Sequence, residues 1–236
     1  MIQMIDIQTL ATGSKGNCYR VSDGSTALLL EAGISFTAIQ KGLEFKTSEI
    51  DGVLVSHEHM DHCKGVEGCL KRGMTIYMSQ GTKDGMGLDN AQIRIIRSKE
   101  QFRIGTWTIL PFDVQHDVNE PLGFLLQSDN GDKLLFATDT YYIKYKFTGL
   151  THLMIECNYD KQTLDENVAS GHIHPVMKKR VMRSHFGLEN LVEFFKANDL
   201  TKVEEIHLLH LSDNNSNVER IFKTVARATG KLIYIP

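Results

Sequence analysis

The chain has 236 residues, 42% of them hydrophobic, and its 26 Lys and Arg against 29 Asp and Glu give a formal net charge of −3 at pH 7. This composition is typical of a globular protein, and it excludes a strongly basic chain that attracts nucleic acid through its overall charge. The length suits one large domain, so a single domain over residues 1–236 is expected.

The chain has no apolar run near the roughly 20 residues of a membrane span, and its first residues lack the pattern of a signal peptide. None of the four cysteines forms a CxxC pair. A cytoplasmic protein with reduced thiols and no membrane partner is therefore predicted.

Short apolar runs between Gly, Ser and Asp turns dominate the first half of the chain and indicate strands. These strands are predicted at residues 5–10, 18–21, 27–30, 52–56 and 75–78. Helices are predicted at residues 33–43 and 62–72.

The second half again begins with strands and continues with helices. Strands are predicted at residues 107–112, 122–127, 133–137, 153–156, 203–208 and 232–235, and helices at 175–183, 188–197 and 214–229. Strands first and helices after, in each half, suit two sheets packed face to face with helices outside.

The strongest local feature is the sequence SHEHMDH at residues 56–62, directly after a buried strand. Residues two apart in an extended stretch lie on the same side, so His57 and His59 can bind one metal ion together. Asp61 and His62 follow as the chain turns into the next helix, where they can reach a second ion. Imidazole and carboxylate ligands suit Zn²⁺, Mn²⁺ or Fe²⁺.

Two metal ions need further ligands, and other strand ends provide candidates. His116, Asp139 and His210 each follow an apolar run. Loops at strand ends are where a rigid scaffold presents functional groups. A carboxylate placed directly after a buried strand, as Asp139 is, also costs free energy unless it is paired or metal-bound.

The order HxHxDH, then His, Asp and His, resembles the metallo-β-lactamase superfamily. The resemblance implies an α/β fold, specifically a four-layer αββα sandwich, and two divalent ions, Zn²⁺ or Mn²⁺. The implied ligands are His57, His59 and His116 for the first ion, Asp61, His62 and His210 for the second, and Asp139 as a bridge together with a water or hydroxide. Glu31 stands where the family usually has Asp in a DxG context, and a supporting role beyond the ligands is expected for it.

Further stretches are similar to the WalJ/YycJ-type branch, whose members are regarded as DNA exonucleases. They lie at residues 12–18, 116–124, 137–140, 156–160 and 209–215. Asp139 at the bridging position, in place of Cys, disfavours a β-lactamase. Residues 184–190 depart from the branch and resemble short phage- or prophage-type relatives, some of which cleave cyclic nucleotides.

Several residues are candidates for the chemistry itself. Besides binding metal, Asp61 and Asp139 are predicted to be catalytic, with Asp61 orienting the hydroxide that attacks phosphorus. His185 is a candidate for protonating the leaving oxygen or binding the phosphate, against a plain helix cap. Ser14 and Asn17, in a Gly-flanked turn, are candidates for substrate binding, against an ordinary β-turn.

The sequence therefore predicts a dinuclear metal-dependent phosphodiesterase, first of all a DNA exonuclease. A cyclic-nucleotide phosphodiesterase, with a pocket completed by the second subunit of a homodimer, is the first alternative. A thioester or lactone hydrolase is the second. A basic run at residues 178–183 places Lys179 and Arg183 on one helix face, either to follow a nucleic-acid backbone or as a solvated surface.

Overall fold

A computed structural model of the chain describes residues 5–236, so residues 1–4 of the stretch inspected for a signal peptide lie outside the described residues. The chain separates into two compact units. The first comprises Met1–Asp113 and Val118–Asp132, and the second comprises Val114–Asp117 and Lys133–Pro236. Among the described residues, no helix combines the length and the apolar character needed to cross a bilayer.

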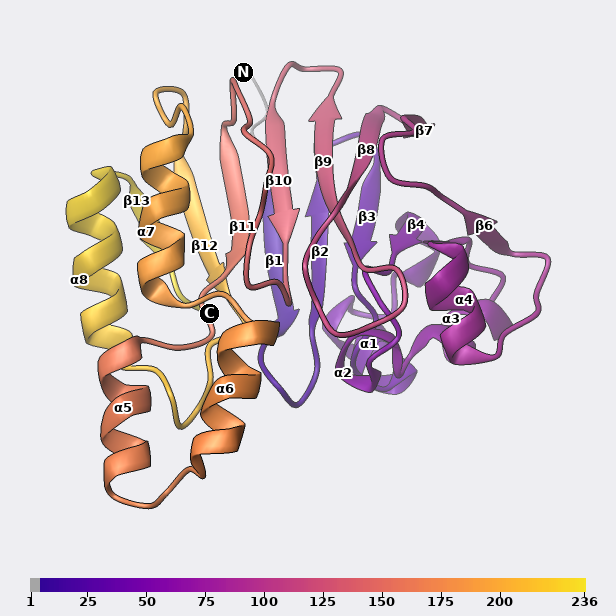
Figure 1. Ribbon diagram of the computed structural model, residues 1–236. Helices are drawn as coiled ribbons and strands as arrows, with labels where there is room; N and C mark the ends of the chain where they lie inside the picture. Colours follow the sequence, from indigo (N-terminus) through magenta and orange to yellow (C-terminus); the bar gives the residue numbers. More distant parts are fainter. Residues whose placement is uncertain (1–4) are drawn as a thin grey trace. The chain divides into compact units, whose positions relative to one another are not determined.

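The first unit contains a mixed sheet of six strands (Figure 1). In spatial order these are β1 (Asp6–Ala11), β2 (Cys18–Ser22), β3 (Ala27–Leu30), β4 (Ile50–Leu54), β5 (Ile76–Met78) and β6 (Ile93–Ile95). The pairs β1–β2 and β2–β3 are antiparallel, and β3 to β6 are parallel to one another. The side chains of β3 are fully buried or nearly so, as its unbroken apolar sequence predicts.

Short helices accompany this sheet: α1 (Phe36–Gly42), the 3-10 turn η1 (Thr47–Glu49), α2 (Met60–Cys63), α3 (Val66–Lys71) and α4 (Gln80–Met86). The helix predicted at 62–72 is in fact two helices, α2 and α3, which divide at Gly65. There the Gly65 amide donates to Ala32 O at 2.7 Å, and a Cβ at Gly65 would lie 2.5 Å from Ile34 O. This close approach to the β3–α1 connection sets the break.

The first unit also contains an antiparallel set of three strands, β7 (Phe102–Ile104), β8 (Trp107–Asp113) and β9 (Leu122–Ser128). The sequence predicted β8 and β9 but not β7, β6 or α4. Each of β6 and β7 has three residues with an arginine in the middle and so lacks an apolar run, unlike the equally short β5. Helix α4 contains two glycines, and Thr82 is its one buried residue.

The second unit is built on four parallel strands: β10 (Lys133–Ala137), β11 (His152–Glu156), β12 (Glu205–Leu209) and β13 (Leu232–Tyr234). Its helices are α5 (Lys161–Ala169), α6 (Pro175–Ser184), α7 (Leu188–Ala197) and α8 (Val218–Thr229). Figure 1 shows α7 beside α8 and α5 beside α6. Because the four strands are parallel, the residues that follow their carboxyl ends meet at one edge.

Candidate metal centre

In the first unit, the histidine motif follows directly on the buried end of β4. His59 is the extended residue that precedes the first turn of α2, and Asp61 and His62 lie in the helix. The ring centroid of His57 lies 4.9 Å from that of His59 and 4.1 Å from that of His62. Ser56 Oγ and His57 Nδ1 are hydrogen-bonded at 2.8 Å, so Nε2 is the ring nitrogen that could hold a metal ion.

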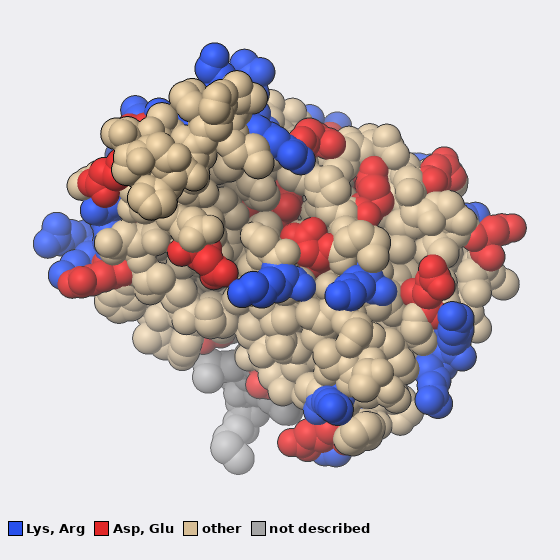
Figure 2. All heavy atoms as spheres, turned by 90° about the horizontal axis from the view of Figure 1, so that it is seen from below, with Lys and Arg blue, Asp and Glu red and all other residues tan. Residues whose placement is uncertain are grey.

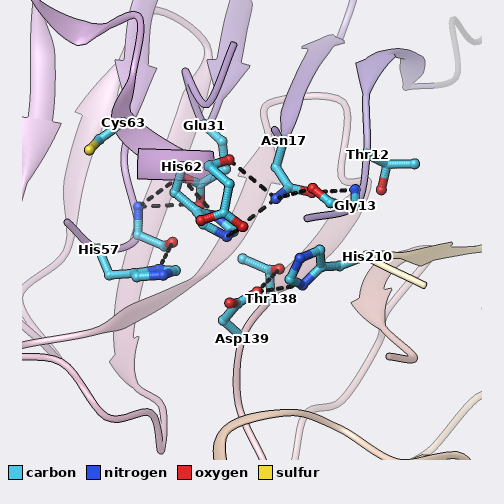
Figure 3. A network of polar contacts seen from close by, with 12 residues as sticks. Thr12, Gly13, Asn17, Glu31, His57, His62, Cys63, Thr138, Asp139 and His210 are labelled. Atoms are coloured by element: carbon cyan, nitrogen blue, oxygen red, sulfur yellow. Dashed lines mark hydrogen bonds and ion pairs between the residues drawn. The ribbon is translucent and has the colours of Figure 1, made fainter. Parts of the chain in front are cut away.

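The ring of His62 is fully buried between polar partners (Figure 3). Its Nδ1 lies 3.7 Å from Glu31 Oε2, and its Nε2 lies 3.5 Å from Asp61 Oδ2. Both Glu31 oxygens also accept the Ser56 amide at 3.3 Å. The carboxylate of Glu31 thus lies on the far side of the ring from Asp61, the arrangement that fixes the tautomer of a metal-binding histidine.

Asn17 lies beside the same ring, with its amide engaged inside the unit. Its Oδ1 accepts hydrogen bonds from Gly13 N and Tyr19 OH, both at 3.0 Å. Its Nδ2 lies 3.2 Å from both Asp61 O and His62 Nε2. Asn17 is fully buried, so these contacts indicate a part in holding the loop against the motif. Direct substrate binding by Asn17 stays a prediction, as it does for Ser14, which is exposed in the same turn.

In the second unit, Asp139 and His210 meet at the edge formed by the strand ends. Asp139 comes two residues after β10 and His210 directly after β12, and both have positive φ, 40° and 53°. Asp139 Oδ1 lies 2.8 Å from His210 Nδ1 and accepts Thr138 Oγ1 at 3.0 Å (Figure 3). Strained backbone of this kind clusters at functional sites.

His116 belongs to the same unit through the short segment Val114–Asp117. Its Nδ1 is hydrogen-bonded to Ser184 O at 2.9 Å, which turns Nε2 toward Asp139 Oδ2 at 3.6 Å. Burial lowers the pKa of His116 below its ordinary value and outweighs the attraction of Asp139. Burial therefore favours the neutral form of the ring, which is the form that binds metal.

Glu156, at the end of β11, is a site residue that the sequence reasoning missed. Its Oε1 lies 2.6 Å from His185 Nδ1 and 3.1 Å from His210 Nδ1. Its Oε2 accepts the amides of Thr140 and Phe186 at 3.1 and 3.0 Å. Burial by itself raises the pKa of Glu156, but the neighbouring His185 and these hydrogen bonds hold it below its ordinary value. The signal that identified Asp139, a carboxylate after a buried strand, was present here too.

His185 lies at the carboxyl end of α6, next to the turn into α7. Its side chain is 21% exposed, and its Nδ1 lies 3.8 Å from Asp139 Oδ2. Although burial lowers the pKa of a histidine, Glu156 raises that of His185 above its ordinary value. The structure therefore places His185 together with Asp139 and His210, while its action on substrate stays a prediction.

The donor groups within the second unit fit a divalent metal ion. In the second unit, ligand atoms of Asp139, Glu156, His185 and His210 all lie within 4.8 Å of one another. Since four donors already engage the Glu156 oxygens, we interpret Glu156 as orienting ligands rather than binding an ion. Imidazole and carboxylate donors are those that Zn²⁺ and Mn²⁺ take in proteins.

Comparisons with known proteins agree with this chemistry. Residues 26–210 match the family model described as "Beta-lactamase superfamily domain". The exodeoxyribonuclease WalJ of Streptococcus pneumoniae (strain D39) is 29% identical over 234 residues, covering 92% of this chain and 85% of that protein. The exodeoxyribonuclease YycJ of Bacillus anthracis is 28% identical over 228 residues, covering 89% and 84%.

A solved structure bears on the fold alone. The metallo-β-lactamase fold protein YhfI of Bacillus subtilis matches with a TM-score of 0.74 at 15% identity, over 98% of this chain and 95% of that one. The α/β fold class of the metallo-β-lactamase type, expected from the motif order, is thereby confirmed.

Proposed function

This chain belongs to the β-lactamase superfamily, and from that premise we propose that it is a dinuclear metal-dependent phosphodiesterase acting as a DNA exonuclease. One observation carries the proposal: similarity over 92% of the chain to a protein named an exodeoxyribonuclease. The His and Asp clusters of both units supply the donors that such an enzyme needs.

We propose as ligands the residues that the motif order implies: His57, His59 and His116 for one ion, Asp61, His62 and His210 for the other, and Asp139 for both. Two divalent ions, Zn²⁺ or Mn²⁺, supply Lewis-acid stabilisation of phosphate charge and lower the pKa of a water molecule. The ligand set draws on both units, and the family match from 26 to 210 includes parts of each. We therefore also propose that residues 1–236 form a single domain.

The protein's own residues have separate tasks in this proposal. Asp61 orients the attacking oxygen, and Asp139 holds the nearby His210. Because Glu156 binds Nδ1 of His185, the Nε2 proton of that ring is the one we assign to the leaving oxygen. Glu31 fixes the ring of His62, and Glu156 fixes the rings of His185 and His210.

The surface charges bear on how a DNA strand is bound. Acidic and basic side chains are interspersed over the face in Figure 2. On α6, Lys178 forms an ion pair with Asp165, and Arg180 Nε lies 3.8 Å from Asp117 Oδ2. Lys179 and Arg183 are exposed and four residues apart. We propose that these two, rather than the whole basic run, contact the DNA backbone.

The proposal is tested with the metal-loaded protein on 5′-phosphorylated linear DNA beside a panel of cyclic nucleotides. Progressive loss of DNA with wild type, but not with Asp61→Ala, is the expected result. Opening of a cyclic nucleotide while DNA stays intact would replace the proposal with the first alternative, and sedimentation would then show whether that enzyme is a homodimer. If wild type with two bound ions attacks neither, a thioester or lactone hydrolase becomes the better reading.

A further inference from the structure

A cavity of about 470 Å³ lies in the second unit, beside the cluster just described. Its volume is within the range of roughly 300–1,000 Å³ typical of small-molecule sites. One wall is the irregular segment from Tyr141 to Lys146, which follows Asp139 in the chain. The other wall is Phe186 with the face of α7 that carries Asn190, Phe194 and Asn198.

Both walls are fastened to the carboxylate of Glu156. Its Oε2 accepts the Thr140 amide, just before Tyr141, and the amide of Phe186. The segment is held at other points too: Asn190 Nδ2 donates to Tyr141 O at 3.2 Å, and the Phe147 amide donates to Asn198 Oδ1 at 2.7 Å. The cavity is thus an ordered feature that adjoins Asp139, His185 and His210 through shared contacts.

The lining combines aromatic rings with positive charge. Tyr141 and Tyr142 are 37% and 56% exposed, although large aromatic side chains are usually more buried. Lys144 Nζ lies 5.1 Å from the ring centroid of Tyr145, and Lys146 is exposed on the same segment. The acid of the lining, Glu193, is ion-paired with Lys196 at 2.7 Å, so the lysines of the segment dominate the charge.

Exposed aromatic rings beside lysines are the combination that binds single-stranded nucleic acid, through base stacking and phosphate contacts. We propose that this cavity binds an unpaired nucleobase near the end of a DNA strand, stacked on Tyr141 or Tyr142, with backbone phosphates on Lys144 and Lys146. The inference rests on the proposed function and deepens it, because it makes a single-stranded end the form of substrate. The amide of Asn190 offers polar groups to the edge of the base.

The test measures binding to the intact, metal-loaded protein without turnover. The probe is an eight-residue thymidylate strand with phosphorothioate linkages, which resist hydrolysis, and with 2-aminopurine at one end. Stacking on an aromatic ring quenches 2-aminopurine fluorescence. Quenching on binding to wild type, stronger for one labelled end than for the other, is the expected result and also reports which end is held.

Substitutions then locate the contact. Stacking of a base on an aromatic ring contributes about 1–3 kcal/mol to the binding free energy. Replacing the tyrosine that carries the stack, by Tyr141→Leu or Tyr142→Leu, is therefore expected to weaken binding about 5- to 150-fold and to abolish quenching. The Tyr→Phe variants keep the ring and are expected to bind as wild type does. Tyr234→Leu is the matched control, because Tyr234 is 42% exposed in the same unit but does not line the cavity. Lys144→Gln with Lys146→Gln is expected to reduce the salt dependence of binding.

The outcomes separate this inference from the proposed function. Unchanged quenching and affinity in both Tyr→Leu variants, or no quenching with wild type, would overturn the cavity as a base site even if the enzyme degrades DNA. Equal losses in Tyr→Leu and Tyr→Phe would also overturn it, because stacking would not be the cause. If wild type degrades no DNA but the tyrosine-dependent quenching is present, the cavity stands as a nucleobase site and the exonuclease proposal fails.

Discussion

At the scale of single residues, Glu156 connects much of the candidate site, because one buried carboxylate engages two imidazoles and two backbone amides. Glu156→Gln keeps the shape but places an NH₂ group against donors. Residues that orient metal ligands in this way typically change metal affinity or activity about 10- to 100-fold when substituted. We expect such losses in both quantities, measured by metal titration and by DNA degradation.

The matched control is Glu204→Gln, an exposed glutamate next to β12 in the same unit. It is expected to leave metal affinity and activity unchanged. Wild-type behaviour of Glu156→Gln in both assays would show that the ring orientations do not depend on this carboxylate.

Asn17 offers a second test at this scale, because its buried amide contacts the loop while its binding of substrate stays a prediction. Asn17→Ala removes the acceptor of Gly13 N and Tyr19 OH inside the unit. Leaving buried donors unsatisfied costs about 1–3 kcal/mol, so we expect the free energy of unfolding to fall by that amount in urea denaturation. Ser14→Ala, in the exposed part of the same turn, is expected to change it by less than about 0.5 kcal/mol. Unchanged stability of Asn17→Ala with a raised KM would instead support substrate binding.

At the scale of elements, α5 buries only Leu164, and its N-cap residue, Asp160, links it to other parts of the second unit. Asp160 caps the helix, accepting Thr163 N at 2.9 Å and Asn217 N at 2.8 Å, and it pairs with Arg220. Burial alone would raise the pKa of Asp160, but these partners hold it below its ordinary value. Since the folded-state pKa lies below the unfolded one, the stabilisation is present above the unfolded pKa of about 3.9 and is lost as the pH falls through the folded pKa.

Asp160→Asn keeps the size of the cap and removes its charge. Hydrogen bonds to charged groups are worth about 1.5–3 kcal/mol, so we expect the variant to be less stable than wild type by that order near neutral pH. The difference should narrow as the pH falls below about 4, in urea denaturation over a pH series. A difference that stays constant down to pH ~2.5 would show that the charge is not its source. Asp84→Asn, on the exposed side of α4, is the control.

At the scale of the whole molecule, metal binding should stabilise the fold, because only the folded chain assembles the ligands. A ligand at 100 times its Kd adds about 2.7 kcal/mol to the free energy of unfolding. Chelation is therefore expected to lower Tm, and added Zn²⁺ or Mn²⁺ to restore it, in thermal unfolding. His172→Ala, an exposed histidine, should keep this response in full.

The same measurement tests whether the two units act as one domain. His57 belongs to the first unit and His116 to the second. If both bind the same ion, either substitution to Ala removes most of the metal-dependent stabilisation, and the double variant loses little more. Losses that add within about 0.5 kcal/mol would mean independent sites, and would contradict the proposed single domain.

The sequence by itself determined the family and most of the secondary structure, because both depend on local spacing. Alternation and apolar runs identified strands such as β4 and β10, and the spacing within residues 56–62 indicated a metal-binding motif without any tertiary information. The missed elements lack such patterns: an arginine interrupts each of the three-residue strands β6 and β7, and α5 buries only Leu164.

Only the tertiary structure decided which side chains support the ligands. Glu156 meets Thr140, His185 and His210 across separations of 16, 29 and 54 residues, and no local pattern links positions so far apart. The contacts of Asn17 with Gly13 and Asp61 were likewise visible only in the tertiary structure, because a polar residue in a Gly-flanked turn has the same sequence signal with or without them. The cavity lined by Tyr141 and Phe186 also depends on tertiary contacts, because the amides of Thr140 and Phe186, from two separate segments, both donate to Glu156.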